Sequence, residues 1–179
     1  MTNHRFFLAV LLVLLASAEV AISAADAPVL NRTQLSVAEK SVDQRMLTLW
    51  SDNSLSLVGA SRAVYLPGIG LVVSAEVNLA VAPISLMGTT LTDNGKAELR
   101  KKKADRLPIL RTAMKEVMAN LAAMLSQVPA SEHIAFSVVL PRYSWEEPSV
   151  VPLQVVMQAT KQDLLGGQRD KAIRVVESN

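Results

Sequence analysis

Apolar residues at helical spacing predict the first element of the fold. Between residues 33 and 50 they recur at every third or fourth position, at Leu35, Ala38, Val42, Met46, Leu49 and Trp50. This spacing is typical of an amphipathic helix, whose start Thr33 or Ser36 could cap. Residues 51–54, which all favour turns, follow directly. We therefore expect a helix over 33–50 that ends in a turn.

Two runs of alternating character predict a β-hairpin. The runs span residues 57–66 and 71–80, and Pro67-Gly68-Ile69-Gly70 stands between them. Proline presets the backbone for a turn, and glycine accepts positive φ. In the second run every other residue is apolar, and the positions between are mostly polar. A period of two with one polar face is typical of a strand that is covered on one side.

A long apolar stripe predicts the main helix, over residues 94–128. Its members are Leu107, Leu110, Met114, Val117, Met118, Leu121 and Leu125, and Pro129 ends it. Pro108 lies inside the stripe. Because proline lacks an N–H donor and clashes with the preceding turn, either a second helix opens at Pro108 or one helix is kinked there.

The last third of the chain predicts two more strands. Residues 133–140 and 151–160 have strand-like patterns, and a loop rich in proline and charge separates them. Residues 161–165 begin a short helix that two glycines stop. A final short element, 170–176, has a type that its pattern does not determine.

The order of these elements predicts the fold class. Helix, two strands, long helix, two strands and short helix form an α-ββ-α-ββ-α series. This series favours an α+β fold with an antiparallel sheet of about four strands and helices on one face. We expect a single domain over 26–179, with a flexible arm at 26–32. The connection at 82–93 is either mobile or covers part of the fold.

Residues 1–25 carry the three parts of an export signal in order. A basic start with Arg5 precedes 11 apolar residues, 6–16. A membrane-spanning helix needs about 20 such residues, whereas a signal peptide needs fewer. Small residues at Ser23 and Ala25 suit cleavage after Ala25. We therefore predict an exported chain, periplasmic or secreted, with a bacterial envelope favoured because cysteine is absent. The mature part is expected to hold no transmembrane segment.

Composition excludes several classes of function. The 179-residue chain is half hydrophobic, has no cysteine and carries a net charge of +2. It therefore has no disulfides, no iron–sulfur clusters and no thiolate zinc sites, and its mild charge does not favour nucleic acid. P-loop, dinucleotide, nucleophile-elbow and zinc-protease motifs are missing. We expect no cofactor and no metal, and a non-catalytic binding or structural role in the envelope.

The basic run Arg100, Lys101, Lys102 and Lys103 is the main candidate binding site, for an anionic surface. Helical projection puts Lys96, Arg100 and Lys103 on the same side as the apolar stripe. We therefore expect the helix to project beyond the sheet or to be redirected at Pro108, with all four basic side chains solvated. Each exposed cation contributes about 1 kcal/mol to binding an anionic surface. The alternative is a solvated helix start with no ligand.

Two loops carry candidates for contact with a partner. The hairpin tip, with Tyr65 and Ile69, is apolar for a turn, and it either tucks against the helices or meets a partner. The loop after residue 140 holds Tyr143 and Trp145, and loops often carry function. A related hypothesis is a subunit whose partner covers the exposed face or edge of the sheet.

A hydrolase without a recognisable motif is the alternative function. Glu146 and Glu147 are adjacent carboxylates in a loop, and His133 is the single histidine of the predicted mature chain. Paired carboxylates can serve as acid and base, but neighbours in a loop usually point apart. A lone histidine without spaced partners is weak evidence for a metal site.

Overall fold

The structure is a computed structural model of the chain, and it describes residues 30–52, 56–82, 91–147 and 151–179. Its elements are α2 (Arg32–Leu47), β1 (Arg62–Leu66), β2 (Gly70–Glu76), α3 (Asp93–Met124), β3 (His133–Val139), β4 (Gln154–Thr160), α4 (Lys161–Leu165), α5 (Arg169–Ala172) and β5 (Arg174–Ser178). The predicted signal peptide, residues 1–25, lies outside the described residues, as do most of the arm and of the connection at 82–93.

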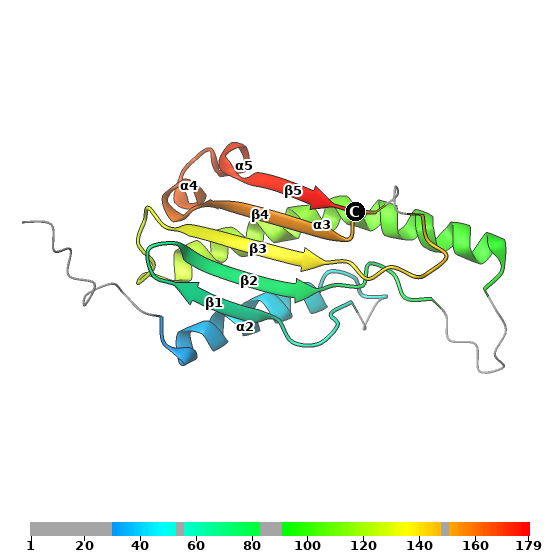
Figure 1. Ribbon diagram of the computed structural model, residues 1–179, viewed down its shortest axis with the longest axis horizontal. Helices are drawn as coiled ribbons and strands as arrows, with labels where there is room; N and C mark the ends of the chain where they lie inside the picture. Colours follow the sequence, from blue (N-terminus) through cyan, green and yellow to red (C-terminus); the bar gives the residue numbers. More distant parts are fainter. Residues whose placement is uncertain (1–29, 53–55, 83–90, 148–150) are drawn as a thin grey trace, which may run out of the picture.

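The five strands form one mixed sheet in the order β1-β2-β3-β4-β5 (Figure 1). Neighbouring strands are antiparallel except for β2 and β3, which are parallel. The prediction of an antiparallel sheet of about four strands is therefore wrong in strand number and in the central pairing. The long helix α3 carries the chain back to the end of the sheet where β2 begins, so β3 runs beside β2 in the same direction.

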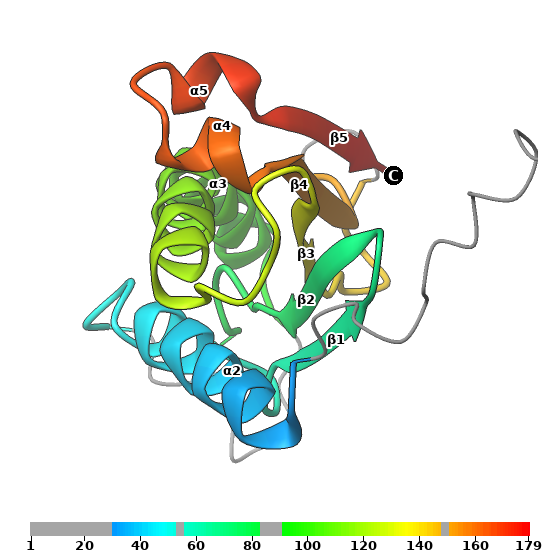
Figure 2. The same cartoon turned by 90° about the vertical axis from the view of Figure 1, so that its left-hand side faces the viewer.

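The α+β class is confirmed, and the long helices lie on one face of the sheet. Figure 2 shows α2 and α3 side by side against that face. The core between the layers includes Met46, Leu110, Met114, Phe136 and Met157, which are fully buried. Alternate residues of β2 point into this core and the others are exposed, except for Gly70 at its start, as the period of two predicts.

The hairpin between β1 and β2 is confirmed, with a loop of three residues where four were expected. The Ile69 N–H donates to the Leu66 oxygen over 3.0 Å, and Gly68 takes the positive φ of +79° that a proline–glycine turn needs. Gly70 belongs to β2 instead of the loop. A Cβ on Gly70 would lie 1.9 Å from the backbone oxygen of His133, so no other residue fits there.

Helix α2 begins earlier than its apolar pattern predicts and closes one edge of the sheet. Asn31, and neither Thr33 nor Ser36, caps its start through a capping box. Leu30, within the predicted arm at 26–32, is buried, and Arg32 already belongs to α2.

Two acids of α2 bind the outer edge of β1. The Glu39 carboxylate accepts the Ala63 N–H over 3.0 Å, and Asp43 accepts the Ser61 N–H over 2.8 Å. Arg32 donates two hydrogen bonds to Glu39 and lowers the pKa of that carboxyl. These bonds satisfy edge donors that would otherwise be open to another strand.

Helix α3 is one continuous helix that contains Pro108, so the alternative of a second helix is wrong. Its first turns extend past the ends of the strands (Figure 1), as the basic run requires. At its other end the buried Lys161 ammonium donates to three carbonyl oxygens, those of Leu125, Ser126 and Val128, over 2.7–3.2 Å. Within the described part of the chain, no helix has the length and apolarity to cross a membrane.

The C-terminal segment contains three elements where two were expected. Residues 161–165 form the predicted short helix α4, and the undetermined 170–176 stretch divides between α5 and β5. All residues of β5 are exposed. Arg111 of α3 holds this strand through two hydrogen bonds to Glu177, of 2.7 and 2.8 Å.

Candidate functional site

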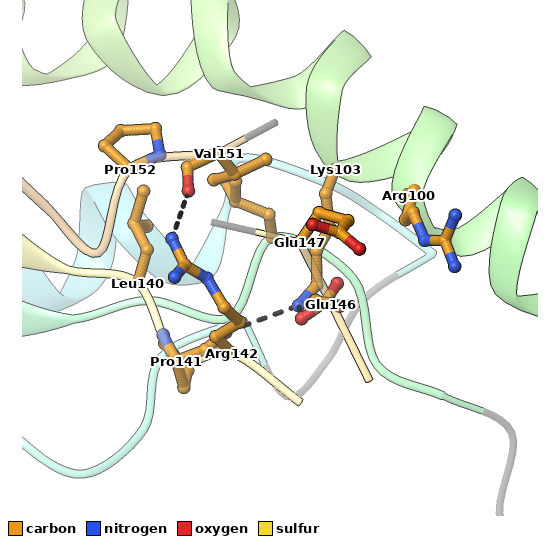
Figure 3. Close-up of a pocket in the computed structure, with 10 residues that line it drawn as sticks. Arg100, Lys103, Leu140, Pro141, Arg142, Glu146, Glu147, Val151 and Pro152 are labelled. Carbon is orange, nitrogen blue, oxygen red and sulfur yellow. Dashed lines mark hydrogen bonds and ion pairs between the residues drawn. The ribbon is translucent and has the colours of Figure 1, made fainter. Parts of the chain in front are cut away.

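The basic run of α3 lies beside the loop that follows β3, and a pocket opens between them (Figure 3). The pocket is small, with a volume of about 20 Å³. Its walls are largely apolar, from Leu79, Leu140, Pro141, Val151 and Pro152, and its charged groups are Arg100, Lys103, Arg142, Glu146 and Glu147. Two predicted sites, the basic run and the loop at 141–147, therefore form one site.

Lys103 is buried, and the expectation that all four basic residues are solvated is wrong for it. Its Nζ lies 2.8 Å from Glu146 Oε2, and the two side chains are 4% and 7% exposed. It also donates to the Pro141 oxygen over 3.3 Å. A lysine can thus continue the apolar stripe because a buried carboxylate neutralises it.

The loop at 141–147 folds around this ion pair. Glu146 accepts the Tyr143 N–H over 2.7 Å, and the Tyr143 hydroxyl accepts the Ala82 N–H over 2.9 Å. Tyr143 stacks on Trp145 with ring centroids 5.4 Å apart. Lys103 lies 4.6 Å from the Tyr143 ring centroid, and Arg100 lies 5.6 Å from that of Trp145. Cations and aromatic rings therefore fasten the loop to α3.

The next two cations of the run pair with acids at the surface. Lys101 contacts Asp105 over 2.7 Å, one turn along the same helix, and this hydrogen bond raises the pKa of Lys101. Lys102 contacts Asp52 over 2.7 Å. The hydrogen bond from Lys102 lowers the pKa of Asp52, and the charge of Arg106 lowers it further. The same Arg106 is buried, donates to the Leu79 oxygen and lies over Trp50.

Arg100 differs from its three neighbours in the run. In the described part of the chain it makes no ion pair with a carboxylate, and its Nε is buried without a hydrogen-bond partner. Figure 3 places its guanidinium at one end of the pocket, directed away from Lys103. A guanidinium with a free fork is suited to a planar anion. Among the described residues, Arg100 is therefore the one member of the basic run without a carboxylate partner.

The candidate residues for hydrolysis are not brought together. His133 begins β3 and the two glutamates follow its other end, about 20 Å away at about 3.3 Å per residue. Glu146 is already bound by Lys103 and by a backbone N–H, whereas Glu147 is exposed. Among the described residues, no group of three or more histidines and acids is placed to hold a metal ion.

The two predicted contact residues of the hairpin tip face different surroundings. Tyr65 is buried, and this burial, with Glu132 nearby, raises its pKa to about 12. Glu132 also accepts the Gly68 N–H over 2.8 Å, which ties the turn to the body of the fold. Ile69 is exposed. The tip is thus tucked in at Tyr65 and open to contact at Ile69.

The pairing of Lys103 with Glu146 has no local signal in the sequence, since 43 positions separate them. The sequence holds one indication of this pairing. Lys103 falls on the apolar side of the helix, where a lysine can be buried only beside an acid. Comparison of the chain with protein families, with curated proteins and with solved structures finds no match.

Proposed function

We propose that this chain is an exported, non-catalytic binding protein of the bacterial envelope that holds an anionic envelope component through Arg100. One observation carries the proposal. Arg100 is the member of the basic run whose guanidinium lacks a carboxylate partner in the described residues, and it sits at the end of a pocket. The Arg100 side chain is partly exposed, so its guanidinium can still contact an anion at the surface.

The pairing of the other three cations with acids determines how strongly the basic run can bind an anionic surface. Four free cations at an anionic surface would contribute about 4 kcal/mol, or roughly a thousandfold in affinity. Lys101, Lys102 and Lys103 each already face a carboxylate. The run therefore supplies about 1 kcal/mol from Arg100, or roughly a fivefold effect. The proposed attachment is weak and depends on one residue.

The test is binding to vesicles of phosphatidylglycerol and, in parallel, of neutral phosphatidylcholine. We expect binding to the anionic vesicles alone, weakening as salt rises. Arg100→Gln should lower the affinity about fivefold. Lys101→Gln is the matched control. It also removes one positive charge, one position along the helix, but Asp105 already neutralises that charge. Equal losses in the two variants, or equal binding to both vesicles, would contradict the proposal.

A further inference from the structure

The pocket beside Arg100 has a second charged side chain that is available to a ligand. Glu147 lines the same pocket (Figure 3) and is exposed, and in the described part of the chain its carboxylate makes no ion pair or hydrogen bond. The other acid of the pocket, Glu146, is bound by Lys103. Arg142 donates to a backbone oxygen of the pocket wall over 2.8 Å. The pocket therefore presents a guanidinium and a carboxylate that can each bind a group of opposite charge.

Arg100 and Glu147 make no ion pair with each other among the described contacts. The Arg100 guanidinium lies over the Trp145 ring, 5.6 Å from the ring centroid, and its Nε is buried. Attraction between the cation and the ring helps to hold the guanidinium in place. A ligand with one negative and one positive group can thus bind Arg100 and Glu147 at the same time, and neither residue has to give up a partner.

The size of the pocket limits the positive group that can enter it. Its volume is about 20 Å³, and a cavity needs about 10–15 Å³ to hold one water molecule. A primary ammonium has nearly the size of a water molecule, whereas a trimethylammonium group is several times larger. Because the walls of the pocket are largely apolar, an ammonium that enters it needs a carboxylate close by, and Glu147 supplies one.

We propose that the anionic group held by Arg100 is the phosphate of a lipid headgroup that also carries a primary ammonium, as phosphoethanolamine does, and that Glu147 binds this ammonium. The inference rests on the proposed function, because the phosphate uses the same Arg100. The planar fork of a guanidinium matches two phosphate oxygens. The contact between Glu147 and the ammonium lies at the surface, where an ion pair increases the affinity by about fivefold at most.

Vesicles that differ only in the neutral lipid test the proposal. Phosphatidylglycerol is mixed at one ratio with either phosphatidylethanolamine or phosphatidylcholine. Both neutral lipids carry one phosphate and one cation, so the two mixtures have the same surface charge. We expect the protein to bind the phosphatidylethanolamine mixture about two- to fivefold more tightly. Glu147→Gln should bind both mixtures equally.

Glu98→Gln is the matched control. Glu98 is an exposed acid of α3, two positions from Arg100, and it does not line this pocket. Its substitution removes the same negative charge but should keep the preference for phosphatidylethanolamine. Loss of the preference in Glu98→Gln as well as in Glu147→Gln would assign it to the overall charge of the protein and overturn the proposal.

Arg100→Gln separates this inference from the proposed function. If the protein binds both mixtures equally while Arg100→Gln still weakens binding, Glu147 recognises no ammonium and only the anion site stands. If Arg100→Gln leaves binding to both mixtures unchanged, the anion site and the ammonium site both fail. A preference for free phosphoethanolamine over free phosphocholine, with no preference between the vesicles, would assign the ligand to a solute and overturn the lipid headgroup.

Discussion

Replacing Lys103 by methionine tests the account of the site at its most unexpected contact. Methionine keeps an unbranched apolar stem but removes the ammonium. Glu146 would then remain 7% exposed, with the Tyr143 N–H as its remaining donor among the described residues. Because the ammonium also lies over the Tyr143 ring, the substitution removes one of the two cation–ring contacts between α3 and the loop as well.

The size of the effect follows from burial. Removing one partner of a buried ion pair costs about 3–5 kcal/mol, because it leaves an uncompensated charge. An exposed ion pair contributes about 0.2–1 kcal/mol. Lys101 and Asp105 form such an exposed pair, with the lysine 78% exposed. Lys103→Met and Lys101→Met therefore make a matched comparison, two positions apart on one helix.

Urea unfolding followed by circular dichroism gives the free energy of unfolding of each variant. We expect Lys103→Met to lose about 3–5 kcal/mol and Lys101→Met to lose less than about 1 kcal/mol. The double variant Lys103→Met/Glu146→Gln should recover part of the loss, since the orphaned charge is gone. If the two lysine variants lose equal amounts, Lys103 is solvated after all and the loop is not anchored as described.

Three further substitutions, one of them with a control variant, test the fold. Lys161→Met should cost about 3 kcal/mol in urea unfolding, because it leaves three carbonyls at the end of α3 without their buried donor. Arg32 lowers the pKa of Glu39 in the folded chain. This pair therefore stabilises the fold fully at pH values above the pKa of an unfolded glutamate, about 4.3. The stabilisation is lost as the pH falls through the lower pKa of the folded state. Glu39→Gln should thus remove part of the acid dependence of stability, measured by urea unfolding between neutral and acid pH, and an unchanged slope would contradict the pairing. Gly70→Ala should prevent folding, because its Cβ would meet a backbone oxygen of β3 at 1.9 Å, whereas Gly68→Ala, with open space around it, should still give a folded circular dichroism spectrum.

Periodicity predicted the elements well where a single face is buried. The alternation over 71–80 corresponds to β2, and the stripe over 94–128 to α3, because each element packs one side against the core. The final strand β5 gave no such signal, since all five of its residues are exposed and an edge strand needs no apolar face.

Topology and the site depended on contacts between distant segments. The parallel pairing of β2 and β3 follows from the return path of α3, which local patterns do not encode. The charge run predicted four free cations, because charge alone does not reveal where an acid from another loop will lie. Asp52 and Glu146 come from segments 50 and 43 positions away from their lysines. Among the residues that the structure describes, Arg100 is left without a carboxylate partner.

The proposed envelope function requires that the chain leave the cytoplasm, so the N-terminal residue of the native protein is the most direct measurement. Cells of the source organism would be fractionated and the protein identified by intact mass and terminal sequencing. The account predicts a chain that begins at Asp26 and is recovered outside the cytoplasm. A chain that still begins at Met1 and is found in the cytosol would contradict it, because Arg100 would then never meet an envelope anion.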